Sequence, residues 1–283
     1  MTFPPRAGLS AGRKQSSTQA RGVPRKRFGQ NFLTDASAIE RIVAALNPTA
    51  EENVLEIGPG RGALTDALLV SVPSISAIEI DRDLAALLRA RYPDDRLRLI
   101  VGDVRKLALG TLADTAPLVI AGNLPYNISK PVAMKLVSEH GAVSRAVLMF
   151  QREVADRLTA GPGTGAYGPL TVLAGRAFRI EPLFDLPPGA FTPRPKVVST
   201  VTRWTPRDPV ALPPSEIGAL RAVLRAAFAH RRQTLQKNLR AVVPAGGATV
   251  GELLEAAGID GSLRPEAVSP EAFVALARRW PRV

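Results

Sequence analysis

The stretch Gly122–Ser129 (Gly-Asn-Leu-Pro-Tyr-Asn-Ile-Ser) places an amide, a rigid proline and an aromatic ring directly after an apolar run. The side-chain oxygen of Asn123 accepts hydrogen bonds, and Pro125 has no backbone N–H, which leaves the carbonyl of Leu124 available as a second acceptor. Tyr126 adds a face on which a flat ring can stack. We predict that these four residues hold a planar base that carries an amino group, with an ordinary turn as the alternative.

Apolar segments around this stretch predict a parallel β-sheet. Pro117–Ala121 is short and apolar, as expected for a buried strand, and ligands of such sheets bind beyond the carboxyl ends of the strands. Asn53–Ile57 is predicted to be the first strand. Gly58–Gly62 then forms a tight loop into a helix that begins near Ala63, and its glycines allow a ligand to approach the backbone closely.

Acidic residues follow the next two predicted strands. Ile75–Ile80 forms the second strand and contains Glu79, whose carboxylate can accept from both hydroxyls of a ribose. Leu97–Val101 forms the third strand and is followed by Gly102 and Asp103, an acceptor suited to the amino group of adenine. A glycine loop with these two carboxylates predicts an adenosine-containing ligand, and the alternative is a series of ordinary caps and turns.

The glycine loop separates two classes of cofactor. Dinucleotide enzymes usually carry G-x-G-x-x-G with a pyrophosphate at the helix N-terminus. Here the loop is G-x-G-x-G, and Glu56 stands two residues ahead of it. This pattern favours S-adenosylmethionine.

The basic residues are concentrated in two segments of this 283-residue chain, whose net charge is +12. Seven of them precede the first acidic residue, Asp35, and six more lie in the acid-free run 221–240, so removing these thirteen charges leaves 12 − 13 = −1 for the rest. They are Arg6, Arg13, Lys14, Arg21, Arg25, Lys26 and Arg27, and then Arg221, Arg225, Arg231, Arg232, Lys237 and Arg240. We expect a polyanionic partner at one or both segments, although a charged helix is more often a solvated face.

Composition excludes several other classes of protein. The chain has no cysteine and only His140 and His230, so we expect neither a disulfide framework nor a metal site. The basic N-terminus lacks the apolar segment of a secretory signal, and no run is long enough to span a membrane. We therefore expect a cytoplasmic protein without membrane association.

Three regions are predicted. Residues 1–24 form a disordered basic tail, residues 25–205 an α/β domain, and residues 206–283 a small all-helical domain after a proline-rich linker. Helical periodicity from Leu220 continues to Leu239 with a basic face, and Val250–Ala257 and Pro270–Arg279 suggest two more helices. The α/β domain also contains a helix between Asp35 and Pro48 and a glycine-rich loop at residues 161–168, which we expect near the substrate.

The motifs together resemble a known family. They are Glu-Ile-Gly-Pro-Gly-x-Gly from Glu56, Gly102-Asp103, Asn-Leu-Pro-Tyr from Asn123, Phe-Gly-Gln-Asn-Phe-Leu ending at Leu33, and Phe-Thr-Pro-Arg-Pro-Lys-Val from Phe191. This set is similar to that of the small-subunit ribosomal RNA adenine dimethyltransferases, from about Arg25 to Ala277. The resemblance implies a Rossmann-like class I methyltransferase sheet and dimethylation of two adjacent adenosines near the 3′ end of 16S ribosomal RNA, in a pre-ribosomal particle and by a monomer.

The resemblance also implies roles for individual residues. The cofactor would be held by Gln30, Asn31, Leu33, Gly58, Gly60, Glu79, Asp103, Val104 and Asn123. Phe191 would form a second stacking face opposite Tyr126, with plain core packing as the alternative. RNA contacts are expected from Arg194, Lys196, Arg231, Arg232, Lys237 and Arg240.

Related functions remain open at this point. Large-subunit adenine dimethyltransferases of the antibiotic-resistance type share the motifs, and DNA adenine methylases share them more loosely. The wording of the stretch from Gly122 and the Phe-x-x-Arg-Arg-x-Thr-Leu-x-x-Asn-Leu segment from Phe228 favour the small-subunit enzyme. A non-catalytic assembly or transcription factor on the same fold is the alternative from a different class.

Overall fold

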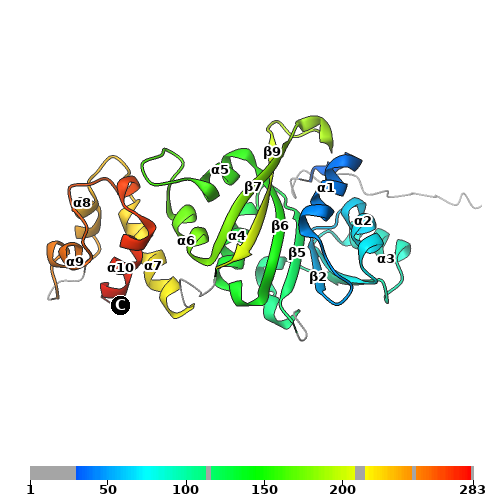
Figure 1. Ribbon diagram of the computed structural model, residues 1–283, viewed down its shortest axis with the longest axis horizontal. Helices are drawn as coiled ribbons and strands as arrows, with labels where there is room; N and C mark the ends of the chain where they lie inside the picture. The colour runs from blue at the N-terminus through cyan, green and yellow to red at the C-terminus, as the bar shows by residue number, and fades with distance from the viewer. Residues whose placement is uncertain (1–29, 113–115, 208–213, 244–246, 282–283) are drawn as a thin grey trace, which may run out of the picture.

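The computed structural model describes residues 30–112, 116–207, 214–243 and 247–281. A central sheet carries helices on both faces, and a group of C-terminal helices extends the molecule beyond one of these helical layers (Figure 1). The predicted basic tail of residues 1–24 lies outside the described residues, as does the first part of the motif that ends at Leu33.

The main sheet has seven strands in the order β4-β3-β2-β5-β6-β9-β7. Its first five strands are parallel, whereas β9 runs antiparallel to both β6 and β7. The strands are β2 (Asn53–Ile57), β3 (Ile75–Glu79), β4 (Leu97–Val101), β5 (Leu118–Asn123), β6 (Val143–Gln151), β7 (Phe178–Leu186) and β9 (Ser199–Pro206). Two short strands, β1 (Phe32–Leu33) and β8 (Phe191–Thr192), pair separately. The predicted parallel sheet is therefore present, and β5 extends through Asn123.

Helices cover the two faces of the sheet in two sets (Figure 1). The first set is α1 (Ala36–Leu46), α2 (Ala63–Ser71) and α3 (Arg82–Arg91), and the second set is α4 (Ser129–Ser138), α5 (Arg152–Thr159) and α6 (Pro169–Ala177). Each set packs into its own apolar core against the sheet. Asp35 caps the predicted helix α1, since its carboxylate accepts from the backbone N–H of Ala38 at 3.0 Å.

The C-terminal part is helical, as predicted, with α7 (Pro214–Ala227), α8 (Leu235–Arg240), α9 (Val250–Ala256) and α10 (Pro270–Arg279). Its buried side chains join the core beneath α4, α5 and α6. Because strand β9 continues to Pro206 and residues 208–213 are not described, the boundary between the two domains remains a prediction.

The prediction of one continuous basic helix to Leu239 is wrong, because α7 ends at Ala227 and α8 begins only at Leu235. Thr234 caps the new helix by accepting from the backbone N–H of Lys237. The Asn238 side chain donates to the carbonyls of Ala227 and His230, at 2.6 and 3.1 Å. These contacts satisfy backbone carbonyls at the end of α7 and stabilise the break.

The glycine-rich loop of residues 161–168 is attached to the helical domain. The Tyr167 ring is fully buried, and its hydroxyl donates to the carbonyl of Val268 at 2.8 Å. The backbone N–H of Gly163 donates to the carbonyl of Glu266 at 2.7 Å, and an Arg231 Nη donates to the Tyr167 carbonyl at 2.9 Å. We call this set of contacts the Tyr167 clasp; it joins the glycine-rich loop to the C-terminal helical part.

Within the described part of the chain, we find no helix with the length and apolar composition needed to cross a membrane.

Candidate functional site

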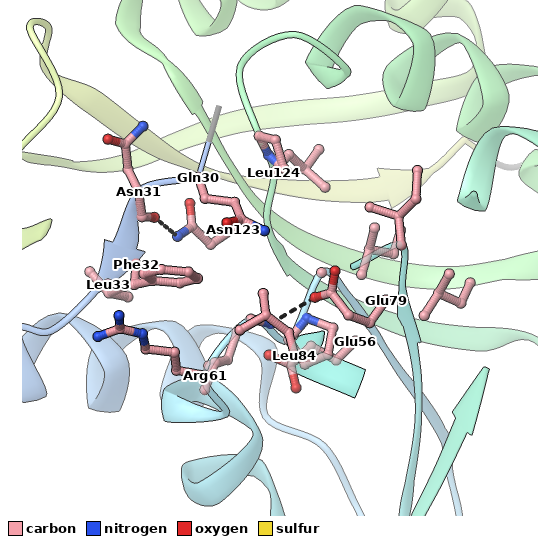
Figure 2. Close-up of a pocket in the computed structure, with 18 of the residues that line it drawn as sticks. Gln30, Asn31, Phe32, Leu33, Glu56, Arg61, Glu79, Leu84, Asn123 and Leu124 are labelled. Atoms are coloured by element: carbon pink, nitrogen blue, oxygen red, sulfur yellow. Dashed lines mark hydrogen bonds between the residues drawn. The ribbon is translucent and has the colours of Figure 1, made fainter. Parts of the chain in front are cut away.

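A cavity of about 520 Å³ opens at the carboxyl ends of the parallel strands. Its walls come from the loops after β2, β3, β4 and β5 and from the segment that enters α1. Figure 2 shows side chains from these separate elements converging on one space. The predicted strand ends therefore meet at a single site, which we call the first cavity.

The glycine loop after β2 lines this cavity with backbone. Gly58 and Gly60 have φ values of +72° and +59°, in the region that favours glycine. A Cβ atom on Gly60 would lie 3.0 Å from the Phe32 ring, and the Arg61 guanidinium lies 4.6 Å from the centroid of the same ring. A larger residue at position 60 would therefore strain the loop and disturb Phe32.

Glu79 ends β3 with its side chain on the first cavity. Its carboxylate accepts from the backbone N–H groups of Gly60, at 3.1 Å, and Asp81, at 2.8 Å. Burial raises the pKa of Glu79 above its usual range, and these two hydrogen bonds oppose that shift. Gln30 reaches the same region and donates to Asp81 at 3.2 Å.

Glu56 is a second carboxyl group in this cavity, and it was not among the predicted site residues. Its side chain is 2 % exposed and accepts from the Thr65 hydroxyl at 2.6 Å. Burial raises the pKa of Glu56 to about 8. Its position two residues ahead of the glycine loop was the available sequence signal, but its burial depends on the packing of α2.

Asp103 follows β4 and lines the cavity beside Val104, as predicted. In this structure its carboxylate also accepts from the Arg105 side chain, at 2.6 to 3.0 Å, and from the Arg105 backbone N–H. The Arg105 guanidinium lowers the pKa of Asp103, which therefore stays ionised. Arg105 is a neighbour of the predicted adenine acceptor that the motif did not indicate.

Asn123 has one side of its amide fixed. Its Nδ2 donates to the backbone carbonyl of Asn31 at 2.9 Å, as the dashed line in Figure 2 shows. Because a carbonyl can only accept, this contact assigns the nitrogen and leaves Oδ1 as an acceptor on the other arm of the amide. Leu124 is 1 % exposed, so its side chain anchors the loop in the core.

Tyr126 lines the cavity with Pro125, and its hydroxyl lies 3.0 Å from the Ser199 hydroxyl. Phe191 is in a different place. Its ring is 2 % exposed in the core, does not line the cavity, and β8 pairs it with Leu33. The structure thus brings Tyr126 to the cavity and does not bring Phe191 there, and the predicted stacking role of Phe191 has no support from this geometry.

The predicted RNA contacts fall in two places. Arg194 and Lys196 are exposed in the loop between β8 and β9. Arg231 and Arg232 lie in the turn between α7 and α8, and Lys237 and Arg240 lie on α8. All six residues are exposed, as phosphate contacts require. Their role in RNA binding remains a prediction.

The residues of the first cavity fit S-adenosylmethionine. Glycine backbone lines the cavity, and the carboxylates of Glu79 and Asp103 there offer acceptors of the kind that ribose hydroxyls and an adenine amino group need. Glu56 adds a buried carboxyl group, which is suited to a cationic ligand because a nearby positive charge offsets the cost of ionising it.

The strand order of the sheet and the cavity at its carboxyl edge define the protein as a class I S-adenosylmethionine-dependent methyltransferase. The chain belongs to the family described as ribosomal RNA adenine dimethylase, whose model matches residues 23–278.

Curated relatives cover most of the chain. A protein of Pseudomonas putida named ribosomal RNA small subunit methyltransferase A is 43 % identical over 255 residues, which are 89 % of this chain and 93 % of that protein. A protein of the same name from Laribacter hongkongensis is 44 % identical over 260 residues, 92 % of this chain and 97 % of that protein.

Solved structures agree with the fold. A dimethyladenosine transferase from Plasmodium falciparum is similar with a TM-score of 0.74 and 25 % identity, over 87 % of this chain and 95 % of that one. The 23S rRNA methyltransferase ErmE is similar with a TM-score of 0.66 and 26 % identity, over 88 % of this chain and 99 % of that one. The predicted methyltransferase fold with helical C-terminal elements is thereby confirmed.

Proposed function

We propose that this protein transfers methyl groups from S-adenosylmethionine to the 6-amino groups of two adjacent adenosines near the 3′ end of small-subunit ribosomal RNA, and so contributes to small-subunit biogenesis. The observation that carries this proposal is the fixed amide of Asn123, which leaves an acceptor oxygen beside a cavity suited to the cofactor. Relatives named as small-subunit methyltransferases support the choice of RNA.

The acceptor oxygen addresses the chemical difficulty of the reaction. The lone pair of an adenine amino group is delocalised into the ring, which makes the nitrogen a weak nucleophile. Asn123 Oδ1 and the carbonyl of Leu124 each accept a hydrogen bond from one N–H of the amino group. These hydrogen bonds draw the nitrogen towards tetrahedral geometry and hold its lone pair in the direction of attack. The nitrogen lone pair would then form a bond to the methyl carbon as the carbon–sulfur bond breaks, with S-adenosylhomocysteine as the neutral leaving group. The methylated nitrogen afterwards loses one proton to water, so neither step needs a strong base.

S-adenosylmethionine supplies an electrophilic methyl group on a sulfonium centre. In our proposal Glu79 holds the ribose hydroxyls and Asp103 the adenine amino group, with Gly58 and Gly60 leaving space for the nucleoside. Val104, Gln30, Asn31 and Leu33 complete the walls of the first cavity. Tyr126 stacks on the target base, which must leave its own helix or loop to enter the site.

The proposal also assigns RNA binding to parts of the chain outside the first cavity. We assign methyl transfer to residues 25–205 and assign RNA binding to the helical residues 206–283, with Arg194 and Lys196 adding contacts from the first domain. The finer expectations, that the substrate is a pre-ribosomal particle and that the protein acts as a cytoplasmic monomer, belong to the same proposal.

The test is methyl transfer from labelled S-adenosylmethionine to unmethylated small ribosomal subunits, with large subunits and duplex DNA in parallel and nucleoside mass analysis of the products. We expect dimethyladenosine in small-subunit RNA alone. Transfer to large subunits instead would make this an enzyme of the resistance type. Binding of small subunits without transfer to any substrate would overturn the proposal in favour of an assembly factor.

A further inference from the structure

A second cavity, of about 780 Å³, lies where the two domains meet. Helices α4, α5 and α6 and the glycine-rich loop contribute one side, and α7 with the turn after it contributes the other. Five of the residues that line it are cationic, and none is acidic. The cations are Lys130, Arg157, Arg221, Arg225 and Arg231.

These cations are not neutralised by neighbouring carboxylates. Among the described residues, Lys130, Arg157, Arg221 and Arg225 form no ion pair and no side-chain hydrogen bond. Glu271 on α10 and Glu216 on α7 pair with other cations, with Arg176 at 2.9 Å and with Arg278 at 3.0 Å. The cavity therefore concentrates positive charge and favours an anionic ligand.

The shape of the second cavity is fixed by the Tyr167 clasp. Arg231 reaches across the domain boundary to the Tyr167 carbonyl, and the Tyr167 hydroxyl is bonded to Val268. The ring of Tyr167 packs 6.2 Å from the Phe228 ring, which lies 5.7 Å from that of Phe273. Because both walls are held before any ligand binds, less ordering is needed on binding.

The lining favours phosphates over bases. Tyr167 is its aromatic residue, and a fully buried ring offers no free face for a base to stack on. Guanidinium groups instead match the geometry of phosphate oxygens and form paired hydrogen bonds with them. A ligand held in this way is recognised by its charged backbone and not by its base sequence.

The start of α4 connects the two cavities. Ile128 lines the first cavity, and Lys130, two residues later, lines the second. The two cavities therefore share the entry to α4, and an RNA strand that delivers a base to the first cavity can continue past Ile128 towards Lys130. We propose that the second cavity binds phosphodiester groups of the substrate RNA that flank the target adenosine. This inference rests on the proposed function and adds a binding site shared by both domains.

The experiment compares Arg221→Ala and Arg225→Ala with Arg89→Ala as a matched control. Arg225 and Arg89 are both exposed in the last turn of a helix, but Arg89 lies on α3 and does not line the second cavity. Alanine is a good helix former, so all three variants are expected to fold, and thermal unfolding verifies this.

The measured quantity is the Kd of each full-length variant for unmethylated small-subunit RNA at several salt concentrations. Each cavity variant should weaken binding by roughly fivefold to tenfold and reduce the slope of log K against log salt by about 0.7 to 0.9. Arg225→Lys should keep the salt slope of the unmodified protein. For every cavity variant, the Kd for S-adenosylmethionine and the turnover at saturating small subunits should match those of the unmodified protein.

Two results would overturn the inference: cavity variants whose salt slope equals that of Arg89→Ala, or cavity variants that lose turnover at saturating subunits with unchanged RNA affinity. Failure of the proposed function is distinguishable, because the unmodified protein would then transfer no methyl group to small subunits. Normal transfer by the unmodified protein with unaffected cavity variants rejects the second cavity alone.

Discussion

The two cavities differ in the sign and the burial of their charged side chains. The first buries Glu56 and Glu79 among glycine backbone and apolar side chains, at the ends of strands. The second surrounds an open space with exposed cations, such as Lys130 on α4 and Arg225 on α7. Buried groups act through short hydrogen bonds and shifted pKa values, whereas exposed cations act through a field that salt screens.

This difference predicts where mutations should be felt. Changes in the first cavity should alter turnover and the pH dependence of stability, with little sensitivity to salt. Changes around the second cavity should alter RNA affinity and its salt dependence. In our proposal, the first cavity carries out methyl transfer and the second cavity binds the RNA.

The largest effect is expected for Asn123→Ala. Losing the acceptor oxygen removes an interaction that strengthens in the transition state, so turnover should fall by roughly 10²- to 10³-fold. The Kd for S-adenosylmethionine, measured by calorimetry, should weaken only slightly. Asn127→Ala is the matched control, since this exposed asparagine lines the same cavity. Equal turnover in Asn123→Ala and the unmodified protein would remove the proposed role.

The pH dependence of stability should change in Glu56→Gln. With a folded pKa of about 8, Glu56 keeps its proton after the unfolded chain has lost it, so its presence makes stability fall as pH rises from 5 to 8. Relative to Glu56→Gln, the free energy of unfolding of the unmodified protein should drop by on the order of 3 kcal/mol over this interval. Denaturant unfolding at a series of pH values measures the difference.

Glu52→Gln provides the control with the opposite shift. Glu52 is paired with Arg145 at 2.6 Å, which lowers its pKa, so it is ionised in both folded and unfolded states above pH 5. The difference between this variant and the unmodified protein should stay flat from pH 5 to 8. A flat difference for Glu56→Gln as well would contradict the ascribed burial effect.

A smaller effect is expected for Tyr167→Phe. Removing the hydroxyl leaves the Val268 carbonyl without this buried hydrogen bond, which should lower the free energy of unfolding by about 1 to 2 kcal/mol. Turnover at saturating small subunits should not change. Thr164→Val, which loses an exposed hydrogen bond to Gly161 in the same loop, should cost only a few tenths of this. A loss of turnover in Tyr167→Phe would show that the Tyr167 clasp affects the chemical step. It would contradict the expectation that only changes in the first cavity alter turnover.

The first cavity was largely predictable from sequence because its parts are local. The two predicted carboxylates, Glu79 and Asp103, lie at a strand end or within two residues of it, and parallel strands bring their carboxyl ends to one edge. The link between Asn123 and the Asn31 carbonyl was not predictable in this way, since 92 positions separate the two residues. Phe191 shows the same limit, because its burial depends on the pairing of β8 with β1 and on packing in the core of the first helix set.

The second cavity depends on tertiary structure almost entirely. Arg221 to Arg240 was visible as an acid-free run, but the break between α7 and α8 divides it. Periodicity continued across the break, whereas the capping contacts of Thr234 and Asn238 ended the helix. Lys130 and Arg157 are ordinary surface residues in sequence, and they meet Arg225 only because the domains pack together.

In the proposed mechanism, the anchored amide of Asn123 also makes the site selective against damaged adenosines in the RNA. Rotating the amide would turn its oxygen towards the Asn31 carbonyl, so the orientation that accepts protons is strongly favoured. Deamination replaces the 6-amino group of adenosine with a carbonyl oxygen, which has no N–H to donate. Oxygen would then face oxygen, and the damaged nucleotide would be refused at the same position where an intact one is modified.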